Sequence, residues 1–228
     1  CRIVVGSHVT DQPNPVNLPV YATADAVSVM EQTIERYDGR LDGRVNAWAM
    51  PFSSDYSSRE LLTAAKELAD RHGTSMALHQ SNSESTVEEH VSRHGKRPVE
   101  YLDDIGVLGP NVLLSHVLGL DETEIGLIAR TGTRAVMCPT AALKTGAWEA
   151  ARGVLPRLLD HGVPVGLGTD SANNSNLVET MRSVYLAAVL HKDAGQDGAA
   201  VSAETALEMA TIQGARSLGL GEDIGSLE

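Results

Sequence analysis

The sequence predicts an α/β fold built on a parallel β-sheet. Short apolar runs alternate with longer helical patterns along the 228 residues, which is the order of elements in α/β proteins. Runs such as 111–115 and 163–168 are apolar on both faces, as strands covered on both sides require. A histidine or aspartate stands at the end of three predicted strands, at His79, His116 and Asp170.

Six short runs are predicted strands. Each is rich in apolar residues and is bounded by glycine, proline or an acidic cap. They cover residues 2–6, 44–50, 75–79, 111–116, 133–138 and 164–168.

The segments between and after these strands are predicted helices, because their apolar residues recur three and four positions apart. In residues 57–72, Ser57 or Ser58 can cap the helix and Gly73 can end it. Asp121 is a predicted cap, with Glu124 as its capping-box partner. The predicted helices are about 22–38, 57–72, 85–94 with 97–105, 121–131, 150–162, 176–193 and 202–217.

The number of strand–helix units leaves two architectures open. Six units fall short of the eight that close a barrel, so the sheet is either open and doubly wound or a barrel that lacks two units upstream. No glycine-rich phosphate loop and no G-x-G-x-x-G motif follows an early strand, which weakens the dinucleotide-type open sheet. We therefore expect one domain over residues 1–228, part of a (β/α)8 barrel.

Composition and charge exclude several classes of partner. The net charge of -12 provides no basic surface for nucleic acid or an anionic membrane, and no apolar run is long enough to span a membrane. The chain opens on RIVVG without the pattern of a signal peptide. Cys1 and Cys138 are too few for a disulfide framework, so the sequence predicts a cytoplasmic protein.

The three polar strand ends predict a metal site. In a barrel the carboxyl ends of the strands converge on one mouth, so His79, His116 and Asp170 should meet there. A lone histidine at a strand end is more often a hydrogen-bonded structural residue. Two histidines and an aspartate together favour a site that holds a divalent ion.

The stretch from Ser75 to Asp170 resembles the amidohydrolase superfamily, especially the aminohydrolase and chlorohydrolase branch that includes guanine, adenosylhomocysteine and triazine hydrolases. The resemblance is carried by LHQSNSES, GKRPVEYLDDIGVLGPNVLLSHVLGLDETEIGLIARTGTRAVMCPT, LLDHGVPVGLGTDSANNSN and TALEMATIQGARSLGLGEDIGSLE. It implies a distorted (β/α)8 barrel in which residues 2–6 form the third strand. The first strands, and the β-sandwich that follows IGSLE in relatives, would then lie outside this chain.

The resemblance also implies ligands and roles. His79 matches the fifth-strand ligand of one divalent ion, Asp170 the eighth-strand aspartate, and His116 the sixth-strand histidine that contacts substrate or the metal-bound water. Zinc is the implied metal, with iron or manganese as alternatives. The first-strand His-x-His pair of the family is absent, since no such motif occurs among the eight histidines.

Two departures bear on the substrate. Deaminating relatives carry a glutamate three residues after the fifth-strand histidine, where this chain has Asn82, and the nearest carboxylate is Glu84. Either Glu84 takes over as proton shuttle, or the substrate needs no ring protonation. Met137 stands where many relatives carry a histidine, and a thioether there is expected to make the pocket more apolar.

These features predict a hydrolase that deaminates a small heterocycle of purine, pterin or triazine type by means of a metal-activated water. Asp170, His116 and Glu84 are the candidate catalytic residues. The alternatives are an amide, substituted-urea or chlorohydrolase reaction at the same centre, and a barrel that binds small ligands without catalysis. A homodimer or higher homo-oligomer is expected. The candidate substrate contacts are Asn82, Thr169, Ser171 and Asn173.

Other residues receive structural interpretations. The i, i+4 pair His90 and His94 lacks the H-E-x-x-H pattern, so we expect a solvated helix face. Cys138 is expected to be buried. His8 is a turn residue or lines the mouth. The two tryptophans, Trp48 and Trp148, are pocket walls or core residues.

Overall fold

The computed structural model describes residues 2–147, 150–176 and 178–227. All six predicted strands are present and parallel, and the first two are each interrupted. The strand segments are β1 (Ile3–Val5) with β2 (His8–Val9), β3 (Val45–Ala47) with β4 (Met50–Pro51), β5 (Met76–Gln80), β6 (Val112–His116), β7 (Arg134–Met137) and β8 (Val165–Leu167).

The strands lie in sequence order. β1 pairs with β3 and β2 with β4, while β5, β6, β7 and β8 form a four-stranded sheet. Two isolated parallel bridges, Ala49 with Met76 and Ser53 with His79, join β4 to β5. Consecutive parallel neighbours connected by helices are the arrangement of a (β/α)8 barrel, of which six units are present. The barrel-type fold is thus confirmed.

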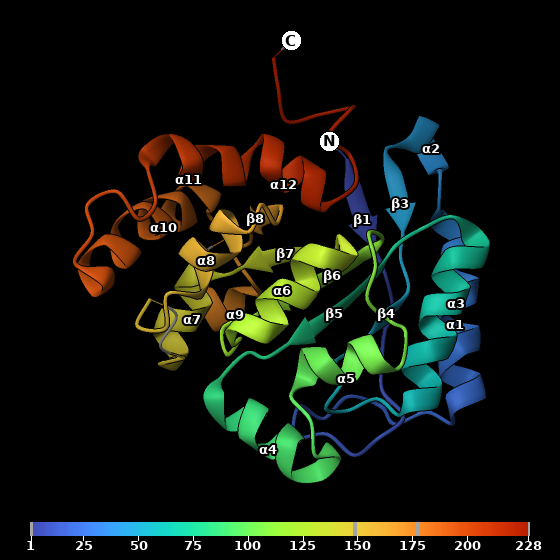
Figure 1. The fold of residues 1–228 in the computed structure, drawn as a ribbon. Helices are drawn as coiled ribbons and strands as arrows, with labels where there is room; N and C mark the ends of the chain where they lie inside the picture. The colour runs from blue at the N-terminus through green and yellow to red at the C-terminus, as the bar shows by residue number, and fades with distance from the viewer. Residues whose placement is uncertain (1, 148–149, 177, 228) are drawn as a thin grey trace.

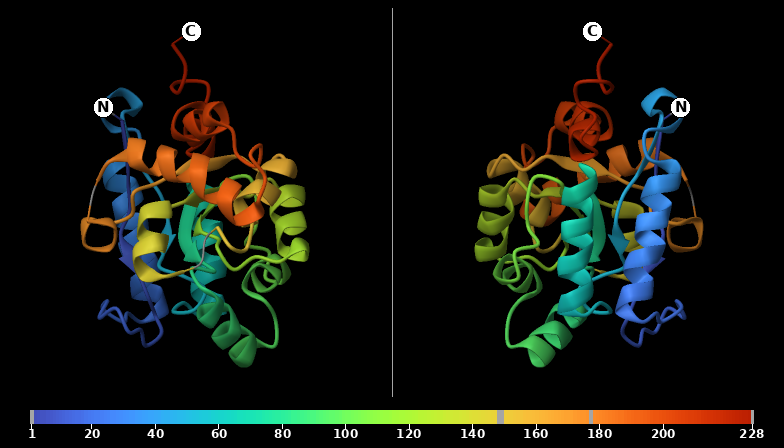
Figure 2. Two further views of the ribbon diagram at one scale, coloured as in Figure 1. Left: turned by 90° about the vertical axis from the view of Figure 1, so that its left-hand side faces the viewer. Right: turned by 90° about the vertical axis from the view of Figure 1, so that its right-hand side faces the viewer.

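Helices surround this sheet. Figure 1 shows α1 and α3 side by side next to β3 and β4, with α10, α11 and α12 gathered at the β8 end of the sheet. The two side views of Figure 2 show the strands inside the ring of helices. The helices are α1 (Thr23–Tyr37), α2 (Arg40–Gly43), α3 (Arg59–His72), α4 (Glu84–His94), α5 (Pro98–Asp104), α6 (Glu122–Thr131), α7 (Pro139–Thr145), α8 (Val154–Asp160), α9 (Ala172–Ser175), α10 (Thr180–Gly195), α11 (Ala203–Ala210) and α12 (Ile212–Ser217).

Several helix ends that were predicted from capping residues are confirmed by the structure. Ser58 caps α3 by accepting a hydrogen bond from the Leu61 backbone N–H, and Gly73 ends the helix in the left-handed conformation. Asp121 and Glu124 form the expected capping box of α6. The face of α3 predicted to be apolar is completely buried; it consists of Leu61, Leu62, Ala65, Leu68 and Ala69.

Three expectations about helices were wrong in part. The helix predicted at 202–217 is two helices, because the backbone leaves the helical region at Thr211 (φ -123°, ψ -102°). The helices predicted at 150–162 and 176–193 begin only at Val154 and Thr180, respectively. The short helices α2, α7 and α9 were not predicted, although Pro139 at the first turn of α7 and Gly146 at its end are ordinary boundary signals.

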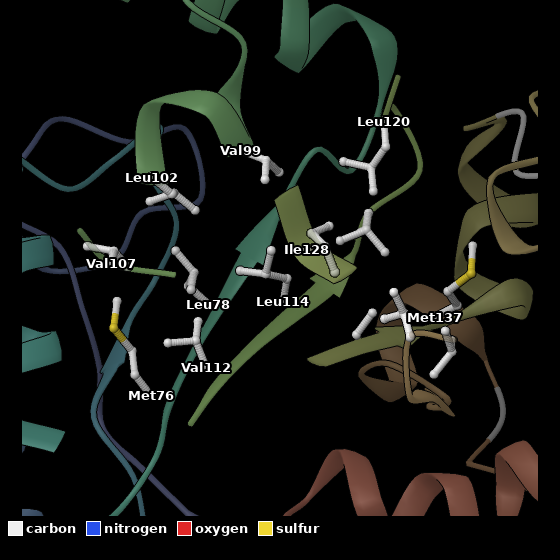
Figure 3. Packing of buried hydrophobic residues seen from close by; sticks show 14 of the residues in the cluster. Met76, Leu78, Val99, Leu102, Val107, Val112, Leu114, Leu120, Ile128 and Met137 are labelled. Carbon is white, nitrogen blue, oxygen red and sulfur yellow. The ribbon is translucent and has the colours of Figure 1, made fainter. Parts of the chain in front are cut away.

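The hydrophobic core lies between the sheet and the helices outside it. Figure 3 shows Met76 and Leu78 of β5 and Leu114 of β6 among the side chains of Val99 and Leu102 from α5. Because side chains alternate along a strand, the intervening residues of β5 face the interior of the barrel. This alternation directs His79 away from the core. Among the described helices, none is long and apolar enough to cross a membrane.

Candidate active site

A cavity of about 340 Å³ lies at the carboxyl ends of the strands. Its walls come from the segments that follow β4, β5, β6, β7 and β8, which are far apart in the sequence. Three of the predicted site residues, His79, His116 and Asp170, line it together. The convergence expected from strand order is therefore present.

His79 is held in one orientation by the neighbouring strand. Its Nδ1 lies 2.9 Å from the carbonyl oxygen of Phe52, and the Phe52 ring packs against it with centroids 4.5 Å apart. Because a carbonyl oxygen only accepts, Nδ1 carries the proton of the neutral ring and Nε2 keeps a free lone pair. The His79 imidazole can therefore act as a ligand or acceptor through Nε2.

His116 lies almost parallel to His79, with ring centroids 5.4 Å apart and an interplanar angle of 20°. Burial, with a smaller contribution from the neighbouring His79, lowers the pKa of His116 to about 4, while the charge of Asp170 opposes this shift. At neutral pH the ring is therefore neutral, the form in which histidine binds a metal or donates a single hydrogen bond.

Asp170 follows β8, and its carboxylate is positioned by its own loop. Oδ1 accepts a hydrogen bond from the Ser171 backbone N–H at 2.6 Å, and Oδ2 accepts one from the Asn174 side-chain amide at 3.3 Å. The backbone of Asp170 is left-handed (φ 61°). These contacts fix the Asp170 carboxylate in the wall of the cavity.

Left-handed backbone recurs at the strand ends around the cavity. Besides Asp170, it occurs at Ser81 (φ 49°), His116 (φ 78°) and Val117 (φ 50°). Each such residue costs roughly 1–3 kcal/mol and persists only where its surroundings enforce it, as they do at functional sites. The Ser81 carbonyl oxygen provides part of this support, since it accepts hydrogen bonds from the Leu118 and Gly119 backbone N–H groups.

The other predicted site residues are divided between the cavity and its surroundings. Asn82 lines the cavity, whereas Glu84 pairs with Arg152 and lines a separate, neighbouring pocket. Thr169, Ser171 and Asn173 are described but do not line the cavity; Asn174 does. Ser171 contributes its backbone N–H to Asp170, and Thr169 donates to the Asp170 carbonyl oxygen.

The exposure of individual side chains tests several of the structural interpretations made from the sequence. Cys138 is buried as expected. The expectation that Met137 lines the pocket was wrong, because its side chain is fully buried in the hydrophobic core. The solvated face expected for His90 was also wrong: that ring is fully buried, while His94 is exposed.

The two remaining ring side chains, His8 and Trp48, also have defined places. The His8 ring lies 5.3 Å from the His79 ring, and partial burial and His79 lower the pKa of His8 to about 4. Trp48 is buried, with the Arg134 guanidinium 5.7 Å from its ring centroid. Trp148 lies outside the described residues.

Sequence reasoning missed the wall formed after β4. Phe52, Asp55 and Tyr56 line the cavity there, together with Ser53. The signal was available, because this segment also follows a predicted strand and must reach the same mouth.

The residues present fit part of a zinc-type donor set. Two imidazoles and a carboxylate are the ligand types that zinc takes in hydrolytic sites, and an Nδ1 hydrogen bond to a carbonyl is the usual support of a ligating histidine. Within residues 2–147, 150–176 and 178–227, no three His, Cys, Asp or Glu side chains are grouped closely enough to hold an ion by themselves. The chain thus offers donors for an ion without a complete site.

Comparisons with known proteins agree with this arrangement. The model of the amidohydrolase family matches residues 1–228. A 5-methylthioadenosine/S-adenosylhomocysteine deaminase from Syntrophobacter fumaroxidans is 36% identical over 99% of this chain and 50% of its own length. An S-triazine hydrolase from Gordonia rubripertincta is 32% identical over 95% of this chain and 44% of its own length.

A solved structure extends the likeness to the fold. An adenosine deaminase from Xanthomonas campestris with bound zinc superimposes with a TM-score of 0.86 at 28% identity, over 100% of this chain and 50% of that one. The chain thus spans about half the length of the relatives that it matches.

Proposed function

Because the chain belongs to the amidohydrolase family, we propose that the protein is a metal-dependent hydrolase that deaminates a small nitrogen heterocycle of purine, pterin or triazine type. The observation that carries the proposal is the convergence of His79, His116 and Asp170 on one cavity. The similarity to a methylthioadenosine/adenosylhomocysteine deaminase and to a triazine hydrolase supports the substrate class.

We assign roles to the chain's own residues. His79, His116 and Asp170 would contribute to holding one divalent ion, with zinc as the first choice. When bound, such an ion supplies a water acidic enough to ionise near pH ~7. Asp170 takes up the proton of the attacking water and passes it to the leaving ammonia, while the neutral His116 donates a hydrogen bond to the atom that gains negative charge.

Further parts of the proposal concern substrate and setting. Asn82 is the proposed direct substrate contact, because it lines the cavity. Thr169 and Ser171 act by orienting Asp170, to which both are hydrogen-bonded. We further propose a cytoplasmic homo-oligomer that binds neither nucleic acid nor membrane, in keeping with the net charge of -12.

The proposal is tested on the full-length protein. Its metal content is measured by atomic emission, and ammonia release is measured with adenosine-type nucleosides, guanine and amino-triazines before and after zinc, iron or manganese is added. We expect bound metal and metal-dependent ammonia release. Protein that holds no metal, and shows no turnover after metal is added, would instead be a binding protein without catalysis.

One observation favours a second candidate function. Asn82 occupies the position of the expected glutamate, and an amide cannot shuttle a proton. Glu84, the nearest carboxylate, pairs with Arg152 in the neighbouring pocket. A substrate that needs no ring protonation, such as an amide, a substituted urea or a chlorinated triazine, fits this arrangement at the same centre.

Replacing Glu84 by Gln separates the two candidates. A nearly wild-type rate of product release by Glu84→Gln would favour the second candidate, with the ion pair to Arg152 keeping Glu84 out of the reaction. Loss of about 2–4 orders of magnitude, the usual contribution of general acid–base catalysis, would instead identify Glu84 as the ring-protonating shuttle of a deaminase. Initial rates of ammonia, amine and chloride release are compared, with Glu88→Gln on the exposed side of α4 as the matched control.

A further inference from the structure

Asp55 is an acidic residue of the cavity wall that the proposed mechanism does not use. It lies in the segment after β4 and lines the same cavity as His79 and Asp170. The residue is only 9% exposed. A carboxylate this deeply buried is costly unless partners compensate for the lost hydration.

Partners on α4 hold one side of this carboxylate. Oδ1 lies 3.1 Å from Nδ1 of His90, whose side chain is fully buried. Arg93 donates from Nη1 to the Asp55 carbonyl oxygen at 2.8 Å, and its Nη2 lies 4.0 Å from Oδ1. The His90 ring itself packs against the rings of His94 and Tyr101, at centroid distances of 4.4 and 5.3 Å. These contacts therefore fix the Asp55 side chain from the side that faces α4.

The second carboxylate oxygen is available to a ligand. In the part of the chain that the structure describes, no backbone or side-chain group donates a hydrogen bond to Oδ2 of Asp55. A carboxylate oxygen accepts but never donates, so its complement is a hydroxyl or amine on the bound molecule.

The charge balance favours a neutral donor. The Arg93 guanidinium already offsets part of the negative charge of Asp55, so a cationic substrate group is not required for compensation. Hydrogen bonds from hydroxyl groups to a carboxylate are short and strong, and carboxylates bind sugar hydroxyls in this way in dinucleotide sites.

We propose that Asp55, positioned by His90, binds a hydroxyl group on the sugar or polyol substituent of the substrate, so that the enzyme selects nucleosides over bare heterocycles. This assignment rests on the proposed function, because it names the substrate class of the same cavity. His90 acts only through Asp55 and is a positioning residue.

The test compares adenosine with 2′,3′-dideoxyadenosine, which lacks the two ring hydroxyls of the sugar. Binding to the full-length protein is measured by calorimetry, and kcat/KM is measured from ammonia release. We expect the wild type to favour adenosine by about 10- to 100-fold, the usual contribution of a hydrogen bond to a charged group. Asp55→Asn should remove most of this preference, and Asp160→Asn, at an exposed position of α8, should retain it.

Each outcome bears on the assignment. A wild-type protein that binds both nucleosides equally would overturn it, whether or not Asp55→Asn folds. A variant in which both nucleosides weaken equally would also overturn it, since that result marks a purely structural role. If the preference depends on Asp55 but no ammonia is released, the assignment stands and the deaminase proposal fails. If neither nucleoside binds, the assignment fails, whereas the deaminase proposal is decided by ammonia release from guanine and amino-triazines.

Discussion

We expect Asp170→Asn to lower the rate of product release by at least about 2–4 orders of magnitude, the contribution of a general acid–base residue. The amide keeps the size of the side chain and can still accept the hydrogen bond from the Ser171 N–H. It cannot take up a proton at neutral pH, and it is a poorer ligand for a divalent ion. Initial rates with the best wild-type substrate, measured with saturating metal, give the change.

The same preparation separates the two roles of Asp170. Metal content that falls together with the rate indicates a ligand, whereas full metal content with a low rate indicates a proton acceptor. Asp193→Asn, at an exposed position of α10, is the matched control and should behave as wild type. A near-normal rate in Asp170→Asn would remove this residue from the mechanism.

Replacing Glu124 by Ala should reduce the free energy of unfolding by about 3–5 kcal/mol, because three hydrogen-bond donors lose a buried charged acceptor at roughly 1–3 kcal/mol each. Glu124 is fully buried, and its carboxylate accepts hydrogen bonds from Arg97 Nε at 2.8 Å and from the Val99 backbone N–H at 2.9 Å. A third bond comes from the Asp121 backbone N–H at 3.2 Å. The substitution leaves all three donors without this acceptor, and Arg97 keeps only its ion pair with Asp121, at 2.9 Å. It therefore loosens the junction of α5 with α6.

Urea denaturation followed by circular dichroism measures this loss. The control is Asp103→Ala, because the partner of Asp103, Arg130, is 63% exposed and such surface pairs contribute at most about 1 kcal/mol. If Glu124→Ala loses no more stability than Asp103→Ala, then the buried pair does not hold the two helices together.

The parts of the fold that could be predicted depend on local patterns. The cap at Ser58, the capping box at Asp121 and the parallel strands follow from neighbouring residues and their spacing. The break at Thr211 and the short helix α7 were missed, although the Pro139 and Gly146 signals of α7 were available. His90 was misjudged because its partner, Asp55, lies 35 residues away and on another element.

The site was predictable to the extent that strand order determines it. Parallel strands bring their carboxyl ends together, so the sequence alone predicts that His79, His116 and Asp170 lie at one mouth. The ion pair between Glu84 and Arg152 could not be predicted from the sequence, because it joins the start of α4 to a segment that precedes α8. Side-chain partners across such distances are set by packing rather than by spacing in the sequence.

The left-handed backbone at Ser81, His116, Val117 and Asp170 has a consequence for how this protein can change. Glycine would relieve the torsional penalty at each of these positions, but at His116 and Asp170 the side chains that line the cavity would be lost with it. A substitution that raises thermal stability at these strand ends is therefore expected to reduce the proposed activity. Variants selected only for heat resistance should accumulate changes there and become slower catalysts.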